Sequence, residues 1–128
     1  MKYIIDTHIF LWFFGNPQKL SKKAKEILTD SESNLKLSVA SIWEIGLKHS
    51  LNKLQLPTPP RDFILERTNK AQIKFLPITP SHTFRVNTLS LDHRDPFDRI
   101  IISQAIEEEC TVITADKKFD DFEVQTIW

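Results

Sequence analysis

Five carboxylates stand where they could take part in chemistry: Asp6, Glu44, Asp95, Asp98 and Asp116. Each follows a short apolar segment or, within HRDPFDR (93–99), precedes the apolar run IIISQAI. Carboxylates gathered at one place raise one another's pKa, and a bound divalent cation relieves their repulsion. Mg²⁺ prefers oxygen ligands and is usually held by one or two carboxylates plus a substrate phosphate. Such a cluster suits phosphodiester hydrolysis, in which the ion polarises the phosphate, generates hydroxide from bound water and stabilises the leaving oxygen.

Two of these acids also have an ordinary structural interpretation. Asp6 can cap a helix over residues 7–14. The motif SIWE matches a capping box, with Ser41 as the cap and Glu44 folding back onto it. Glu44 can also pair with Lys48 four residues later, which contributes about 0.2–0.5 kcal/mol.

The remaining acids have local roles as well. Asp95 as cap, Pro96 at the first helical position and Asp98 at the third make a good helix start. Asp116 can be a turn residue. Asp98, however, shares a helical face with apolar residues and should therefore point inward; these are Ile101, Ile102 and Ala105. We expect Asp98 to belong to a site, and whether Asp95 contacts metal or only caps its helix stays open.

Other polar side chains near these acids could assist them. Hydroxyl groups could orient carboxylates or water, and the candidates are Thr7, Ser41 and Thr114. Basic side chains could hold substrate phosphates, although each could equally be a plain surface charge; these are Arg99, Lys48 and Lys117. The four histidines, at positions 8, 49, 82 and 93, lack zinc-ligand spacing and are interpreted as surface or packing residues.

Strands and helices alternate along the sequence. Strands are expected over residues 2–5, 35–39, 73–78, 111–114 and 124–128. Helices are expected over residues 7–14 and 41–51, and two more begin at Ser21 and at Pro96. Two further helices are expected to run from Thr58-Pro59 to about residue 72 and from Thr79-Pro80 to about residue 89. This order predicts a single α/β domain over residues 1–128, a three-layer α/β/α sandwich with a mainly parallel five-stranded sheet. In such folds ligands bind beyond the carboxyl ends of the strands, where the acids are expected to meet.

Composition narrows the functional classes. The 17 basic and 17 acidic residues balance, so the net charge does not indicate binding to nucleic acid. The first half of the sequence nevertheless carries nine basic side chains against six acidic ones. The one cysteine, Cys110, excludes an intrachain disulfide and favours a reducing compartment. No apolar span is long enough to cross a membrane, so we expect a cytoplasmic protein. The dense apolar run IFLWFF must be buried either by its own core or by a partner.

Three other classes lack their required residues. A haloacid-dehalogenase-like phosphatase needs a second aspartate two residues after Asp6, where the sequence has His8. A receiver-like module needs an acceptor aspartate after the third strand, and KFLPITPSH contains none. With Gly15 and Gly46 as the only glycines, neither a P-loop nor a dinucleotide fingerprint can form.

Five motifs, in this order, resemble the PIN domain, and most closely the VapC-type toxins of bacterial toxin–antitoxin pairs: DTHIFLW, SVASIWEIGLKHSLNKL, LPITPSH, HRDPFDRIIISQA and TVITADKKF. The motif RDPFDR followed by a helix is specific for this family, whereas DTH or TAD alone would not distinguish it from other families. The resemblance implies a PIN-like sandwich and an Mg²⁺- or Mn²⁺-dependent endoribonuclease. Asp6, Glu44, Asp98 and Asp116 match the family's acidic quartet, and Asp95 matches the first acid of the same motif.

Within that quartet, the resemblance implies that Asp6 and Asp98 bind metal most directly. Asp116 and Glu44 would bind it through water or activate the attacking water. It further implies cleavage of structured RNA such as tRNA or an rRNA loop, with inhibition of translation. A homodimer is expected, and so is a cognate VapB-like antitoxin, a small DNA-binding protein whose tail wraps the toxin. A PIN nuclease of RNA maturation and a non-catalytic RNA-binding or scaffold PIN module stay open as alternatives.

Overall fold

Five short strands build one sheet in the computed structural model, which describes all residues 1–128. The strands are β1 (Lys2–Ile5), β2 (Asn34–Ser38), β3 (Lys74–Leu76), β4 (Thr111–Ile113) and β5 (Thr126–Ile127). Their order is β3-β2-β1-β4-β5, and every neighbouring pair is parallel. All carboxyl ends of the strands therefore lie at the same edge, as the alternating sequence pattern predicts.

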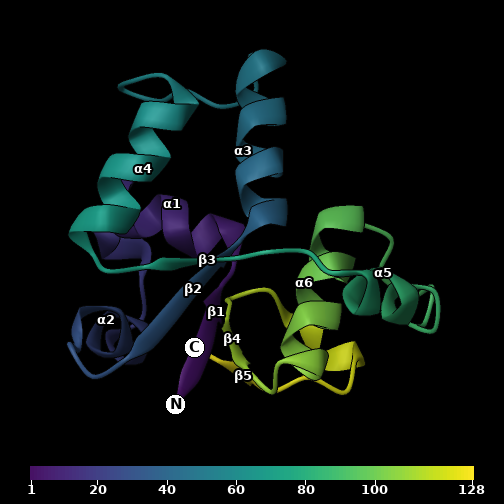
Figure 1. The fold of residues 1–128 in the computed structure, drawn as a ribbon. Coiled ribbons are helices and arrows are strands. Elements are labelled where there is room, and N and C mark those ends of the chain that lie inside the picture. Colours follow the sequence, from purple (N-terminus) through teal and green to yellow (C-terminus); the bar gives the residue numbers. More distant parts are fainter.

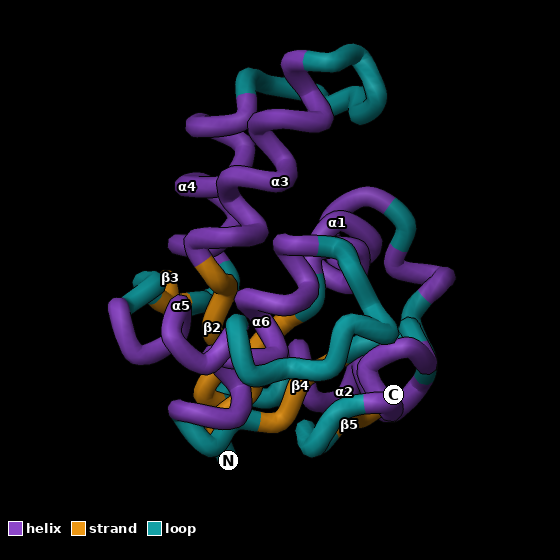
Figure 2. The backbone as a smooth tube through the Cα atoms, turned by 90° about the vertical axis from the view of Figure 1, so that its right-hand side faces the viewer, coloured by secondary structure: helices purple, strands orange, loops and turns teal.

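Helices cover both faces of this sheet, which confirms the predicted three-layer sandwich. They are α1 (Thr7–Gly15), α2 (Lys22–Thr29), α3 (Val39–Ser50), α4 (Pro60–Lys70), α5 (Pro80–Val86) and α6 (Pro96–Glu107), with short 3-10 turns η1 (Pro17–Lys19) and η2 (Lys117–Asp121). Figure 1 shows α1, α2 and α4 on one side of the strands and α5 and α6 on the other. In Figure 2, α3 and α4 rise together away from the sheet.

The two layers of core follow the period-2 alternation of the central strands. Tyr3 and Ile5 of β1 join the core under α1, α2 and α4, as does Ile113 of β4. Ile4 and Val112 point the other way, into the core under α6. The central strands are apolar on both faces, as expected for a parallel sheet covered on both sides.

Several expected boundaries were wrong. Helix α5 ends at Val86 and not near residue 89, and β5 covers Thr126–Ile127 and not 124–128. Two further differences have a clear local cause. Helix α3 begins at Val39, two residues earlier than expected, because the Ser38 hydroxyl caps it by accepting the Ala40 N–H at 3.0 Å. Ser41 lies inside the helix, so the predicted capping box does not form. Strand β3 ends at Leu76 instead of continuing to residue 78, because the next residue is a proline, which has no N–H to donate to the ladder.

The apolar run of α1 is mostly covered by the chain's own core. Ile9 and Phe10 are fully buried. The following four residues, Leu11, Trp12, Phe13 and Phe14, are half-buried and pack against the same core cluster. None of the helices has the length and apolar character needed to cross a bilayer.

Candidate functional site

The carboxyl edge of the sheet gathers the acids that the sequence singled out. Asp6 directly follows β1, and Asp116 follows β4 and starts η2. Glu44 lies in the second turn of α3 and Asp98 in the first turn of α6. The charges of Glu44 and Asp116 both raise the pKa of Asp6, and that of Asp6 raises the pKa of Asp98, so these groups lie near one another.

Asp6 is held by a strand neighbour and does not cap α1. Its side chain makes no capping hydrogen bond. Instead the Thr114 hydroxyl donates to Asp6 Oδ2 at 2.8 Å, and the same hydroxyl accepts the Asp116 N–H at 3.0 Å. Thr114 therefore fixes one carboxylate directly and the backbone of the other, in line with its expected orienting role.

Glu44 is buried, with 2% of its surface exposed. Its Oε2 accepts a 2.6 Å hydrogen bond from Lys48, whereas its Oε1 is buried without any partner. One turn earlier, the Thr7 hydroxyl donates to Ser41 Oγ at 2.8 Å, which pins the start of α1 to α3. Neither hydroxyl bonds a carboxylate, so this pair joins the two helices and does not orient an acid directly.

Lys48 is a cation in direct contact with one of the acids, Glu44. Burial lowers the pKa of Lys48, but the hydrogen bond and charge of Glu44, together with the charges of Asp95 and Asp98, outweigh burial and raise it. Its ammonium group therefore partly neutralises the site, and with 39% of its side chain exposed it is also open to a substrate phosphate.

The two aspartates of the RDPFDR motif, Asp95 and Asp98, have different roles. Asp95 Oδ1 accepts the N–H groups of Phe97 at 2.9 Å and Asp98 at 3.3 Å, which makes it the N-cap of α6. Asp98 points to the site, and His93 Nε2 lies 2.8 Å from its Oδ2. The sequence interpretation of His93 as a surface or packing residue missed this contact. Its position in the loop just before the helix that carries Asp98 could have indicated it.

The ionisation of the buried acids is strongly perturbed. Burial is the main cause that raises the pKa of Asp98, to about 7, and the charges of Asp6 and Asp95 add to it against the opposing hydrogen bond of His93. Burial likewise raises the pKa of Asp6, against the Thr114 hydrogen bond. Groups whose pKa is raised by both burial and neighbouring acids are typical of functional sites.

Arg99 was expected to be a candidate for binding phosphate, and this was wrong. Its side chain is 8% exposed, and its guanidinium donates to the carbonyls of Val86, Leu89, Ser90 and His93. These bonds hold the loop between α5 and α6 and turn both terminal nitrogens of the guanidinium toward the protein's own backbone. Lys117, by contrast, is exposed.

The donor set fits a divalent ion. One ligand atom each from His93, Asp98 and Asp116 lies within 4.8 Å of the other two. The unpartnered Glu44 Oε1 adds a buried oxygen that needs a positive neighbour. Repulsion among these carboxylates raises the free energy of the folded protein unless a positive charge lies between them. A bound divalent cation would supply that charge.

The family model of the PIN domain matches residues 3–124. The chain belongs to the PIN domain family. This PIN domain is 26% identical over 116 residues to Ribonuclease VapC22 of Mycobacterium tuberculosis, which covers 90% of this chain and 87% of the relative. The family resemblance read from the motifs is thereby confirmed.

Solved structures confirm the fold. VapBC2 from Rickettsia felis, bound to a DNA fragment from its promoter, is similar with a TM-score of 0.75 and 17% identity over 99% of this chain and 98% of that chain. DNA-bound VapBC from Salmonella typhimurium gives a TM-score of 0.71 with 12% identity, over 99% of this chain and 97% of that chain. The PIN-like arrangement of sheet and helices thus extends over essentially the whole chain.

Proposed function

We propose that this PIN domain is a metal-dependent endoribonuclease of the VapC type. The observation that carries the proposal is the acid cluster at the carboxyl edge of the sheet, in which Asp6 and Glu44 are buried and burial raises the pKa of Asp98 to about 7. The 26% identity to a curated ribonuclease supports RNA as the substrate. The protein would act as a cytoplasmic toxin that cleaves structured RNA, either tRNA or rRNA, and so inhibits translation.

The residues would divide the chemistry according to their surroundings. Asp6 and Asp98 would hold Mg²⁺ or Mn²⁺, and Thr114 would keep Asp6 in a fixed orientation. When bound, the ion supplies Lewis-acid stabilisation of phosphate charge and lowers the pKa of water. Glu44 and Asp116 would orient the attacking water, and Glu44 keeps its Oε1 free for this because Lys48 binds its other oxygen.

The direct test measures cleavage of total tRNA and of ribosomal RNA by the purified protein. We expect cleavage with Mg²⁺ or Mn²⁺, loss in EDTA and recovery on adding the ion back. Asp98→Asn should abolish cleavage with the fold intact, because the swap is nearly isosteric. The matched control is Asp92→Asn, which removes the same charge from an exposed position of the same loop. Full activity of the Asp98 variant, or cleavage that persists in EDTA, would refute the proposed site.

A cellular experiment separates a toxin from an RNA-processing enzyme. Induction of the wild-type chain alone should arrest growth and translation, and induction of Asp98→Asn should not. An active nuclease that is harmless on its own would favour RNA maturation. RNA binding without any cleavage by the wild-type protein would favour a non-catalytic PIN module.

We also propose a VapB-like antitoxin partner, because two of the similar solved structures are VapBC assemblies and another is a toxin–antitoxin complex. An apolar cavity of about 330 Å³ between α1 and the segment joining α3 to α4 could take an apolar segment of its tail. Trp12 and Phe14 line one side of the cavity and Leu54 and Leu56 the other. Co-expression with the gene adjacent on the chromosome should restore growth and give a co-purifying complex, and Leu56→Asp should weaken that complex.

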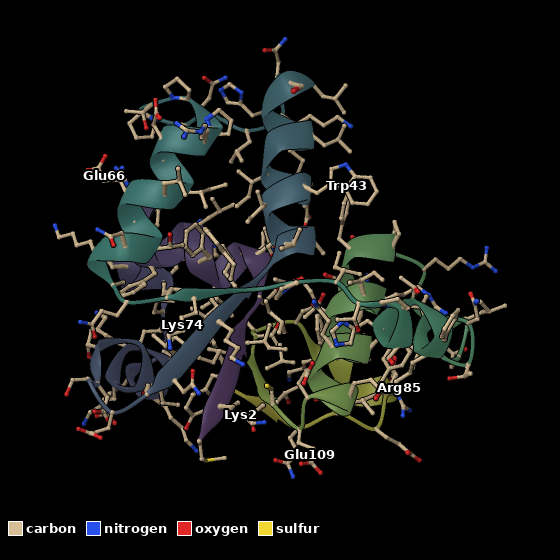
Figure 3. All side chains as sticks on the ribbon, in the orientation of Figure 1. Lys2, Trp43, Glu66, Lys74, Arg85 and Glu109 are labelled. Atoms are coloured by element: carbon tan, nitrogen blue, oxygen red, sulfur yellow. The ribbon has the colours of Figure 1, made fainter.

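We propose further that the protein forms a homodimer. Helix α3 and the leucine that follows it expose an apolar stripe at four-residue spacing, made of Val39, Trp43, Leu47 and Leu51. Figure 3 shows Trp43 projecting from α3 toward the start of α6, where its ring lies 4.9 Å from that of Phe97. Such a stripe on a surface helix is typical of a protein interface. Sedimentation should therefore show a dimer that Leu47→Glu dissociates, whereas Leu65→Glu, at an equally exposed leucine of α4, should not.

A further inference from the structure

His93 is the histidine that directly contacts one of the acids, and the proposed function gives it no role. It is 8% exposed and lies in the loop before α6. Its Nε2 is 2.8 Å from Asp98 Oδ2. A nitrogen donor so close to a proposed metal ligand either orients that ligand or binds the ion beside it.

The distances around His93 match those of ligands on one ion. Bond lengths near 2.1 Å place neighbouring ligand atoms of an octahedral ion about 3 Å apart and opposite ones about 4.2 Å apart. The 2.8 Å between His93 Nε2 and Asp98 Oδ2 fits neighbouring positions. Asp116 contributes the third atom, and the three lie within 4.8 Å of one another. Only small side-chain movements would bring all three onto one ion.

The surroundings hold the imidazole ring in this direction. The Arg99 guanidinium donates to the His93 carbonyl at 2.9 Å. The rings of Phe119 and Phe122 flank the imidazole, each with its centroid 6.3 Å away. His93 Nδ1 makes no protein hydrogen bond and is not sealed from solvent. It can therefore carry the ring proton while Nε2 presents its lone pair, which is the form that binds metal.

We propose that His93 is a metal ligand through Nε2, together with Asp98 and Asp116, and that it makes the site prefer Mn²⁺ over Mg²⁺. The proposal rests on the metal site of the proposed function and revises it, because Asp116 becomes a direct ligand beside Asp98 where the proposed function had it orient water. Mg²⁺ takes oxygen ligands. Mn²⁺ also favours carboxylates, but as a first-row transition-metal ion it accepts an imidazole nitrogen more readily than Mg²⁺ does. One nitrogen in an otherwise carboxylate site therefore shifts selectivity toward Mn²⁺.

The test reads the metal's ligands without using RNA. Mn²⁺ is added to the purified protein, and pulsed electron paramagnetic resonance detects nitrogen-14 coupled to the ion. We expect a directly coordinated nitrogen, whose signal changes to that of nitrogen-15 when the protein is made with nitrogen-15 histidine. This experiment uses the wild-type chain, so it does not depend on any variant folding.

The matched variants are His93→Gln and His8→Gln, the second at an exposed histidine whose charge also acts on Asp6. A glutamine at position 93 can still donate to Asp98 but supplies no imidazole nitrogen. We expect it to remove the nitrogen signal and to weaken Mn²⁺ binding about tenfold or more, with a smaller loss for Mg²⁺. His8→Gln should keep both the signal and the affinity.

Each outcome bears on a different claim. Mn²⁺ bound to wild type with no nitrogen coupling, or a Mn²⁺/Mg²⁺ affinity ratio unchanged by His93→Gln, would overturn the ligand role and leave His93 as a positioning residue for Asp98. The proposed nuclease function would survive that result if RNA cleavage still required metal. Absence of any bound Mn²⁺ or Mg²⁺ would overturn both proposals.

Discussion

Replacing Asp98 by asparagine should stabilise the metal-free protein while it removes activity, because the charged carboxylate is unfavourable where it lies. Folding raises the pKa of Asp98 from 3.8 to about 7, chiefly through burial. A group whose pKa is raised by folding favours the folded state fully below its unfolded value. That advantage is lost as the pH rises through the folded value. The metal-free protein should therefore lose stability between about pH 4 and pH 8.

The size of the effect follows from the two pKa values. The raised pKa of Asp98 costs about 4 kcal/mol of folding free energy at pH 8, where the folded carboxylate is ionised, and about 2 kcal/mol at pH 5, where folding requires the carboxyl to take up a proton. The amide has no charge to bury, so Asp98→Asn avoids this cost at both pH values. The gain in stability over wild type should thus be about 2–3 kcal/mol larger at pH 8 than at pH 5.

Urea unfolding in EDTA at the two pH values measures this difference. Asp92→Asn, at an exposed position of the same loop, should show no comparable change with pH. Addition of Mn²⁺ should then reverse the order by stabilising wild type, by about 2.7 kcal/mol at a hundredfold excess over the dissociation constant, and the variant much less. If Asp98→Asn is no more stable than wild type at pH 8, or its advantage does not change with pH, the burial argument is wrong.

Three further substitutions test individual contacts. Lys48→Met should lower the unfolding free energy by about 1–3 kcal/mol at pH 7, because Glu44 would keep a buried charge without its donor. Arg99→Lys should destabilise by about 2 kcal/mol or more, since one ammonium cannot serve four carbonyls, and it should lower activity by loosening the loop that carries His93. Asp95→Asn should keep the α6 cap and most of the stability, because asparagine caps as well as aspartate, so its cleavage rate reports whether the charge matters. Urea unfolding and RNA cleavage by each variant provide the measurements.

Other results would contradict these contacts. An unchanged stability of the Lys48 variant would mean that Glu44 is not charged when buried. A fully stable Arg99 variant would mean that the loop does not depend on its guanidinium. A cleavage rate for Asp95→Asn equal to wild type would assign Asp95 to capping alone.

Most of the fold was predictable from local patterns. The apolar segment before Asp6 and the one before Asp116 are strands, and the Asp95-Pro96 start of α6 is where the capping pattern placed it. These features depend on residues close together in the sequence, and their preference for strand, helix or helix cap is largely the same in any fold. The cap of α3 was misassigned because Ser38 and Ser41 are both good candidates, and only the end of β2 selects the first.

The sequence by itself determined which residues could do chemistry, because acids that follow parallel strands must meet at one edge of the sheet. Only the tertiary structure decided what each side chain faces. It placed His93 against Asp98, turned Arg99 inward to four carbonyls, and left one oxygen of Glu44 buried without a partner. These contacts depend on how the α5–α6 loop and the helices pack across the sheet edge. Packing of that kind follows from the whole arrangement of burial and hydrogen bonding and is not encoded in any short motif.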